Sequence, residues 1–189
     1  MNAAHEICEN WQSLYCAGSP MPKYFRKRAS EYFSFVFQKT EEEAQRLKYF
    51  GYPIYRVISP RPNKKLLYFD DLYYSFSSDL CGVSQVATKD KNMRCNLFLI
   101  IARPTEAVDF NKLGNELFEY FDKTRYYKEN EIVSKLSFKT IDSVYYLKDA
   151  EDIMSFQQKG VLISNNDLLL NIKKVVNKYN LPMKWLMDN

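Results

Sequence analysis

The spacing of apolar residues changes at Pro53, and this change constrains the fold more than any other feature of the sequence. Between residues 22 and 38, aromatic and aliphatic side chains recur every three or four positions, which is typical of an amphipathic helix that begins at a proline. The letters TEEE at 40–43 fit a capping box and predict a second helix that ends near Gly51. We therefore expect the first 50 residues to be helical.

After Pro53 the chain consists of short runs rich in β-branched and aromatic residues, which predict strands. These runs are IYRVI at 54–58, LYYSFSS at 72–78, NLFLIIA at 96–102, EIVSKLSFKTI at 131–141 and GVLIS at 160–164. Between them FNKLGNELFEYFDK predicts a short helix, and NNDLLLNIKKVVNKYN predicts a longer one capped by Ser164 or Asn165. The fold class is therefore α+β, with helices at both ends of the chain.

The length and composition favour one domain in an aqueous compartment. A chain of 189 residues can form a single domain with its own core, and a hydrophobic share of 46% excludes a disordered chain. No apolar run approaches the roughly 20 residues that span a bilayer. The first residues, MNAAHEICENW, lack the basic start and apolar stretch of a secretion signal. We expect a soluble protein, made and folded in a cytoplasm.

Several chemistries lack the residues they need. His5 is the only histidine and the four cysteines show no Cys-x-x-Cys spacing, so neither a zinc site nor a Ser-His-Asp or Cys-His mechanism is expected. The five glycines are too far apart for a phosphate-binding loop or a Rossmann turn. The net charge of +4 is modest, and KYFRKR at 23–28 is interpreted as a solvated helix face rather than a nucleic-acid site.

Two glutamates lie one residue apart at the start of the predicted strand after residue 130. Successive side chains of a strand point to opposite faces, so Glu129 and Glu131 share one face. Like charges this close repel each other. The pair is also typical of an exposed strand edge, where carboxylates prevent pairing with other chains.

Three short motifs follow one another in strand-like surroundings. They are Tyr55-Arg56, Ser75-Phe76-Ser77 and Glu129-Asn130-Glu131. In this order the chain resembles the mono-ADP-ribosyltransferases of the Arg, Ser-x-Ser, Glu-x-Glu class, which include bacterial toxins, injected effectors and phage enzymes. The resemblance covers roughly residues 52–145 and implies a split β-sheet core there, within the single domain over 1–189 that the chain length favours. A helical cap at 1–51 and a C-terminal strand and helix extension at 146–189 would flank that core.

The resemblance also implies roles for individual residues, with NAD⁺ as a substrate and no metal. Glu131 would hold the nicotinamide-side ribose and stabilise an oxocarbenium-like transition state, as carboxylates do in glycosidases. Glu129 would orient the acceptor and take its proton. Ser75 would hydrogen-bond the catalytic glutamate, and Ser77 would hold the strand against the cofactor. Arg56 would anchor the phosphates of the dinucleotide.

The same resemblance places Tyr126 and Tyr127 where the family keeps an aromatic residue that contacts the protein substrate. The alternative is that these tyrosines pack in the core or at its rim.

Two features depart from the family pattern. Only 19 positions separate Arg56 from Ser75, which is short, so Arg61, Arg26 or Arg28 could anchor the phosphates instead. No long helix is evident between SFSSD and Cys95.

These motifs lead to three hypotheses for the function. The first is transfer of ADP-ribose from NAD⁺ to a protein side chain; the glutamate at position 129 resembles the arginine-modifying members, so arginine is the expected acceptor. The second is an NAD⁺ glycohydrolase or phosphorolysis toxin, and the third is a binding or inhibitor protein without chemistry. The expected partner is a protein target, in the producing cell or in a host cell into which the protein is injected, rather than a membrane or a nucleic acid.

Overall fold

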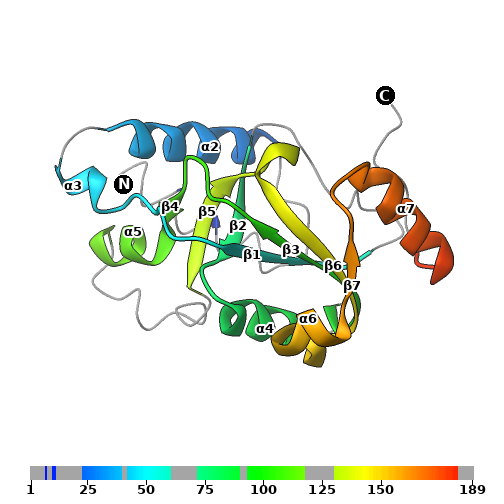
Figure 1. Cartoon of the computed structure of the whole chain (residues 1–189). Coiled ribbons are helices and arrows are strands. Elements are labelled where there is room, and N and C mark those ends of the chain that lie inside the picture. The colour runs from blue at the N-terminus through cyan, green and yellow to red at the C-terminus, as the bar shows by residue number, and fades with distance from the viewer. Residues whose placement is uncertain are drawn as a thin grey trace.

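The computed structural model describes residues 7, 10, 11, 23–39, 42–60, 72–89, 93–117 and 130–182 (Figure 1). The helices are α2 (Lys23–Gln38), α3 (Glu42–Gln45), α4 (Leu80–Lys89), α5 (Phe110–Leu117), α6 (Phe156–Lys159) and α7 (Leu168–Lys178), with short 3-10 helices at Phe138–Thr140 and Ala150–Ser155. The strands are β1 (Ile54–Ile58), β2 (Tyr73–Ser77), β3 (Cys95–Ala102), β4 (Val108–Asp109), β5 (Glu131–Lys135), β6 (Ile141–Asp149) and β7 (Val161–Ile163). The predicted α+β class is confirmed.

The strands form one antiparallel sheet in the order β4-β5-β2-β1-β3-β6-β7. β1 is the middle strand of this order, with β2 on one side and β3 on the other. Each strand is rich in the β-branched and aromatic residues that suit a sheet covered on both faces. In the part of the chain that the structure describes, no helix is long and apolar enough to cross a bilayer.

The two halves of this sheet are joined weakly. β1 pairs with β3 along its whole length, from Ile54 opposite Ala102 to Ile58 opposite Phe98, whereas β1 and β2 share a single register pair, Tyr55 opposite Ser77. Further along β2, the backbone groups that would face β1 bond to side chains instead.

At this free edge of β2, the amide of Tyr73 donates to Ser30 Oγ of α2 at 3.0 Å. The Arg56 guanidinium donates to the carbonyl of Ser75. Side chains therefore satisfy the backbone groups of β2 that would bond to β1 in a complete ladder. The strands β1 and β2 can then separate without leaving these groups unpaired.

The sheet has two faces, which we name after what lies on them. The α7 face carries Ile54, Phe76, Ile100 and Ile132, which pack in one apolar cluster with Leu168, Ile172 and Val176 of α7. The opposite face, here called the Glu131 face, carries two separate clusters. One joins Tyr73, Val108 and Val133 to the N-terminal residues, α2 and α5; the other joins Val57, Leu97 and Leu99 to Val83 and Ala87 of α4 and to Phe156 of α6.

The strand register puts both clusters of the Glu131 face on one surface of the sheet, because Tyr55 and Ser77 are directly opposite each other. In Figure 1, however, α2 lies on one side of the sheet and α4 and α6 lie on the other. The sheet therefore turns between β2 and β1, where the two strands share a single register pair.

Helix α2 docks on the half of the sheet formed by β4, β5 and β2. Phe25, Ala29 and Phe33 are spaced by four residues, lie on one side of the helix and are buried. The Phe33 ring contacts the rings of Tyr73 at 5.4 Å and Phe110 at 6.2 Å between centroids. The N-terminal helical segment is thus part of the core that supports this half of the sheet.

The predicted second helix is largely wrong. Thr40, the predicted N-cap, lies outside the described residues. Of the described residues from 42 to 51, only Glu42–Gln45 is helical, because the following residues pair with the edge of the sheet. Lys48 forms an isolated bridge with Val108, and the amide of Tyr49 donates to the carbonyl of Ala107 at 2.9 Å. The amide of Asp109 also donates to the carbonyl of Leu47 at 2.8 Å.

Three other expectations are corrected. A helix, α4, does follow the SFSSD segment, where none was evident from the sequence. The run predicted as one strand over 131–141 is broken by the 3-10 helix at Phe138–Thr140. The N-cap of α7 is Asp167, because the Asn165 side chain instead donates to the carbonyl of Ile141 at 3.2 Å. The predicted helix at 110–123 is confirmed as α5 through Leu117, and its last residues lie outside the described ranges.

Candidate functional site

Ser75, Ser77 and Glu131 come together on the Glu131 face. Ser77 lies directly opposite Glu131 in the register of β2 and β5, and Ser75 lies opposite Val133, two positions further along the same face. Ser77 is 4% exposed and Glu131 is 6% exposed. Directly opposed side chains of an antiparallel pair are closer than diagonal ones. Ser77, rather than Ser75, is therefore the serine nearest in register to the glutamate.

The carboxylate of Glu131 is held by a residue far away in the sequence. The indole Nε1 of Trp11 donates to Glu131 Oε1 at 3.0 Å, and this hydrogen bond is buried. Among the described residues, the buried polar side chains are Ser30, Ser77, Glu131 and Ser134, and of these Glu131 alone is a carboxylate. Burying a carboxylate costs free energy unless hydrogen bonds compensate for the lost water. Such residues are concentrated at functional sites.

A tight set of hydrogen bonds fixes the entrance to β5. Asn130 has a φ of 46°, in the left-handed region, which asparagine tolerates better than most residues. Its carbonyl accepts from the amide of Ser78 at 3.0 Å, and its side-chain amide donates to Asp79. The other Asp79 oxygen accepts from the amide of Gly82 at 2.7 Å, in the first turn of α4. The start of α4 and the residue before Glu131 are thus tied together.

Two tyrosines beside this turn are kept neutral. Burial, and then the negative charge of Asp79, raise the pKa of Tyr55, which lies opposite Ser77. Burial also raises the pKa of Tyr49, partly opposed by a hydrogen bond with Ser78. Both hydroxyls therefore keep their protons to a higher pH than an ordinary tyrosine does, and they can donate hydrogen bonds.

Arg56 is bonded to the backbone carbonyl of Ser75, but its side chain does not lie on the face that carries the side chains of Ser75, Ser77 and Glu131. Its guanidinium carbon lies 5.3 Å from the centroid of the Tyr74 ring and 6.0 Å from that of Phe76, and both rings belong to the α7 face. The guanidinium of Arg26 lies 4.5 Å from the same Tyr74 ring. Two arginines therefore converge on Tyr74 where β1 and β2 separate. Arg28 is exposed on α2.

Several predicted site residues cannot be placed. Glu129, Tyr126, Tyr127 and Arg61 lie outside the described residues. The Glu-x-Glu motif is therefore seen only through Asn130 and Glu131.

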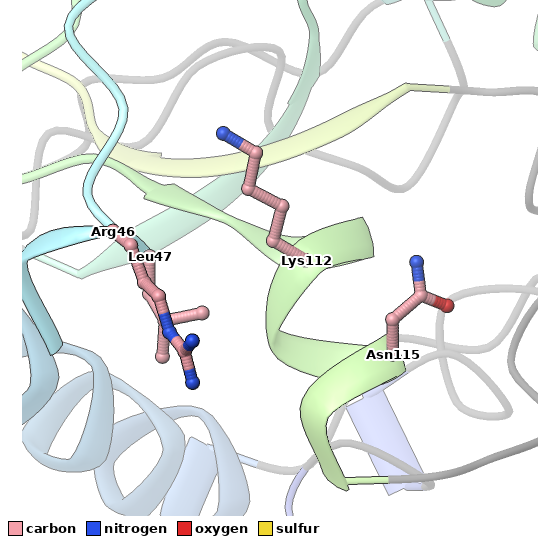
Figure 2. Close-up of a pocket in the computed structure, with 4 residues that line it drawn as sticks. All are labelled: Arg46, Leu47, Lys112 and Asn115. Carbon is pink, nitrogen blue, oxygen red and sulfur yellow. The ribbon is translucent and has the colours of Figure 1, made fainter. Parts of the chain in front are cut away.

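A pocket of about 380 Å³ opens between the end of α3 and α5 (Figure 2). Arg46, Leu47, Lys112 and Asn115 line it. The Lys112 ammonium lies 3.7 Å from the carboxylate of Asp109. Two cationic side chains and an amide favour an anionic ligand, but Glu131 is not among the lining residues. Within the described ranges, no three His, Cys, Asp or Glu side chains gather as a metal ion would require.

The sequence interpretation missed three residues of this region. Asp79 follows a strand and precedes apolar residues at helical spacing, so it could have been recognised as an N-cap. Asn130 is a residue type enriched at positive φ, which is a weak signal. Trp11 gave no signal, because 120 positions separate it from the glutamate that it contacts.

Comparison of the chain with protein-family models, with curated proteins and with solved structures found no match.

Proposed function

We propose that this protein is a mono-ADP-ribosyltransferase that uses Glu131 to transfer ADP-ribose from NAD⁺ to a protein side chain. The observation that carries the proposal is a buried carboxylate at the start of a strand, directly opposite a buried serine hydroxyl. Such a carboxylate is expensive for stability and suits a reaction that develops positive charge.

The reaction breaks the bond between nicotinamide and the C1′ atom of the ribose. The bonding electrons leave with the nicotinamide nitrogen, which becomes neutral, and positive charge develops on the ribose ring. A carboxylate near the ring stabilises this charge, and a hydrogen bond to a ribose hydroxyl would orient the sugar. Glu131 is proposed for both roles.

The acceptor then attacks C1′ and loses a proton. Glu129 is proposed to receive that proton, and arginine is the proposed acceptor. In an extended chain Glu129 would share the face of Glu131, although Asn130, with its positive φ, lies between them. Tyr126 and Tyr127 are proposed to contact the protein substrate.

The architecture supports a split catalytic core. The sheet divides where β1 and β2 share one register pair, and each half has its own helices on the Glu131 face. Ser75, Ser77 and Tyr55 lie along this boundary, between the two apolar clusters. A dinucleotide could lie across the boundary with its nicotinamide end at Glu131.

The phosphate anchor is proposed from the arginines near the same boundary. Arg26 and Arg56 flank Tyr74 there, and a pair of guanidinium groups suits a pyrophosphate. Arg56 lies on the opposite face from Glu131 and Arg26 contacts the same Tyr74 ring, so Arg28 and Arg61 remain candidates alongside them.

The proposal is tested by incubating the purified protein with NAD⁺ carrying a label on its adenine, with and without a cell lysate. Transfer of the label to a protein band, removed by an arginine-specific ADP-ribosyl hydrolase, would support the proposal. Release of nicotinamide at the same rate without lysate, with no labelled protein, would identify a glycohydrolase instead. If neither sample consumed NAD⁺, the hypothesis of a binding or inhibitor protein without catalytic activity would be favoured. Glu131→Gln is the test variant, and Glu31→Gln, an exposed carboxylate on α2, is its control.

A further inference from the structure

We propose that Trp11 is a positioning residue for Glu131: its indole N–H holds one carboxylate oxygen in place and favours the ionised form. The catalytic meaning of this contact rests on the proposed function. The contact itself rests on the structure alone.

The chemistry of the pair favours a strong bond. Indole Nε1 is a donor only, and an ionised carboxylate is an acceptor only, so each group meets a suitable partner. The distance from Nε1 to Oε1 is 3.0 Å, and Trp11 is fully buried while Glu131 is 6% exposed. A hydrogen bond to a charged group is about twice as strong as one between neutral groups, and water does not compete for it in a buried site.

Trp11 itself has little freedom to move. Its ring meets the edge of the Phe33 ring at a centroid distance of 5.0 Å and an interplanar angle of 86°. Phe33 in turn packs against Tyr73 of β2 and Phe110 of α5. Ile7 and Trp11 are both helical, are spaced by four residues and are buried in the same cluster. The indole is therefore held by contacts with α2 and β2, which belong to the same half of the sheet as Glu131.

A fixed donor matters because a glutamate side chain has three rotatable bonds. With Oε1 engaged by the indole, the orientation of the carboxylate plane is restricted. This is the kind of preorganisation on which electrostatic stabilisation depends.

A hydrogen bond to the charged form of a carboxyl group favours ionisation, whereas burial opposes it. The charged and titratable groups of the Glu131 face are few among the described residues. Lys135, on β5, lies 2.7 Å from Glu106, to which the Tyr73 hydroxyl also donates at 3.2 Å. Asp79 is bonded to Asn130, and the buried hydroxyl of Tyr55 faces Ser77.

The first test needs no enzymatic activity. The chain has two tryptophans, Trp11 and Trp185, so an ¹⁵N-labelled sample has two indole N–H resonances, and Trp11→Phe assigns them. We expect the Trp11 resonance to shift in Glu131→Gln, and to shift with pH in the wild type as Glu131 takes up a proton. A Trp11 resonance unchanged in Glu131→Gln would overturn the contact, whether or not the protein cleaves NAD⁺.

The second test measures NAD⁺ cleavage by the Trp11→Phe variant, which keeps an aromatic ring and loses the N–H. We expect kcat to fall about tenfold to a hundredfold, the range for losing a hydrogen bond to a charged group, while KM for NAD⁺ changes little. The acid limb of the pH profile should move to higher pH, so that activity partly recovers there.

Phe110→Leu is the packing control, because Phe110 is fully buried in the same cluster and its side chain has no hydrogen-bond donor to offer a carboxylate. It should lower the Tm and leave kcat and the pH profile as in the wild type. If Trp11→Phe behaves like Phe110→Leu, the positioning role is refuted. If the wild type does not cleave NAD⁺, the proposed function fails, and the resonance test still decides whether the indole holds the carboxylate.

Discussion

Replacing Phe33 by alanine is expected to release the N-terminal segment from the sheet. Phe33 is fully buried on α2, and its ring contacts Trp11, Tyr73 and Phe110. Truncation of a buried phenylalanine to alanine costs about 3–5 kcal/mol, from lost burial and the cavity left behind. For a chain of this length, each kcal/mol lowers the Tm by about 2–4 °C. We therefore expect a fall in Tm of roughly 6–20 °C.

Phe35→Ala is the matched control on the same helix. Phe35 is 56% exposed and its ring lies 5.0 Å from the Lys39 ammonium, so its truncation should cost less than about 1 kcal/mol. Urea unfolding followed by circular dichroism, with equal m values for both variants, gives the comparison. Costs that agree within about 1 kcal/mol would refute the docking of α2 on the β4-β5-β2 half of the sheet.

Three further predictions concern the boundary between the sheet halves. Asn130→Ala and Asn130→Gly both lose the bond to Asp79, but alanine tolerates the φ of 46° poorly. We therefore expect the alanine variant to be about 1 kcal/mol less stable than the glycine variant, and the reverse order in thermal unfolding would contradict this. Arg56→Lys loses the guanidinium bond to the Ser75 carbonyl and should lower the stability by about 1 kcal/mol, and an unchanged Tm would contradict that bond. In the same variant, a raised KM for NAD⁺ would identify Arg56 as the phosphate anchor, whereas an unchanged KM would favour the other arginines. Because its folded pKa is raised, Tyr55 contributes stability that is present below its ordinary pKa of 10.0 and is lost as the pH rises above it; Tyr55→Phe should flatten the fall in urea midpoint above pH 10, and an unaltered slope would contradict the shift.

The spacing of apolar residues predicted those helices and strands in which the same apolar residues are buried against the rest of the protein. The four-residue spacing of Phe25, Ala29 and Phe33 predicted α2 because the same residues meet the sheet. The apolar run before Arg103 predicted β3 because a central strand is covered on both faces. Elements decided by distant partners were missed.

Helix α4 shows this limit. Its sequence, LCGVSQVATK, contains glycine, serine and threonine, which have low helix propensity. The helix forms because Asp79 caps it and because Val83 and Ala87 are buried against β1 and β3. In the second predicted helix, distant contacts act against the helix: Lys48 pairs with Val108 at the sheet edge, so the chain is extended there.

The candidate site was predictable only within strands. Alternation along β2 puts Ser75 and Ser77 on one face, but their position on the same face as Glu131 depends on the register between β2 and β5. The face of Arg56 depended on the register between β1 and β2, which the sequence does not contain. The contact from Trp11 depended on the docking of the whole N-terminal segment.

The most direct test of the account is the rate of nicotinamide release from NAD⁺ by the wild type and by Glu131→Gln, at equal concentration and with the Tm of both recorded. The account predicts that the wild type releases nicotinamide and that the variant does so roughly a hundredfold more slowly or worse, because it lacks only the charge. The variant should unfold at the same temperature or higher, because a buried carboxylate is costly. Equal rates in two folded proteins would contradict the assignment of Glu131 as the catalytic residue.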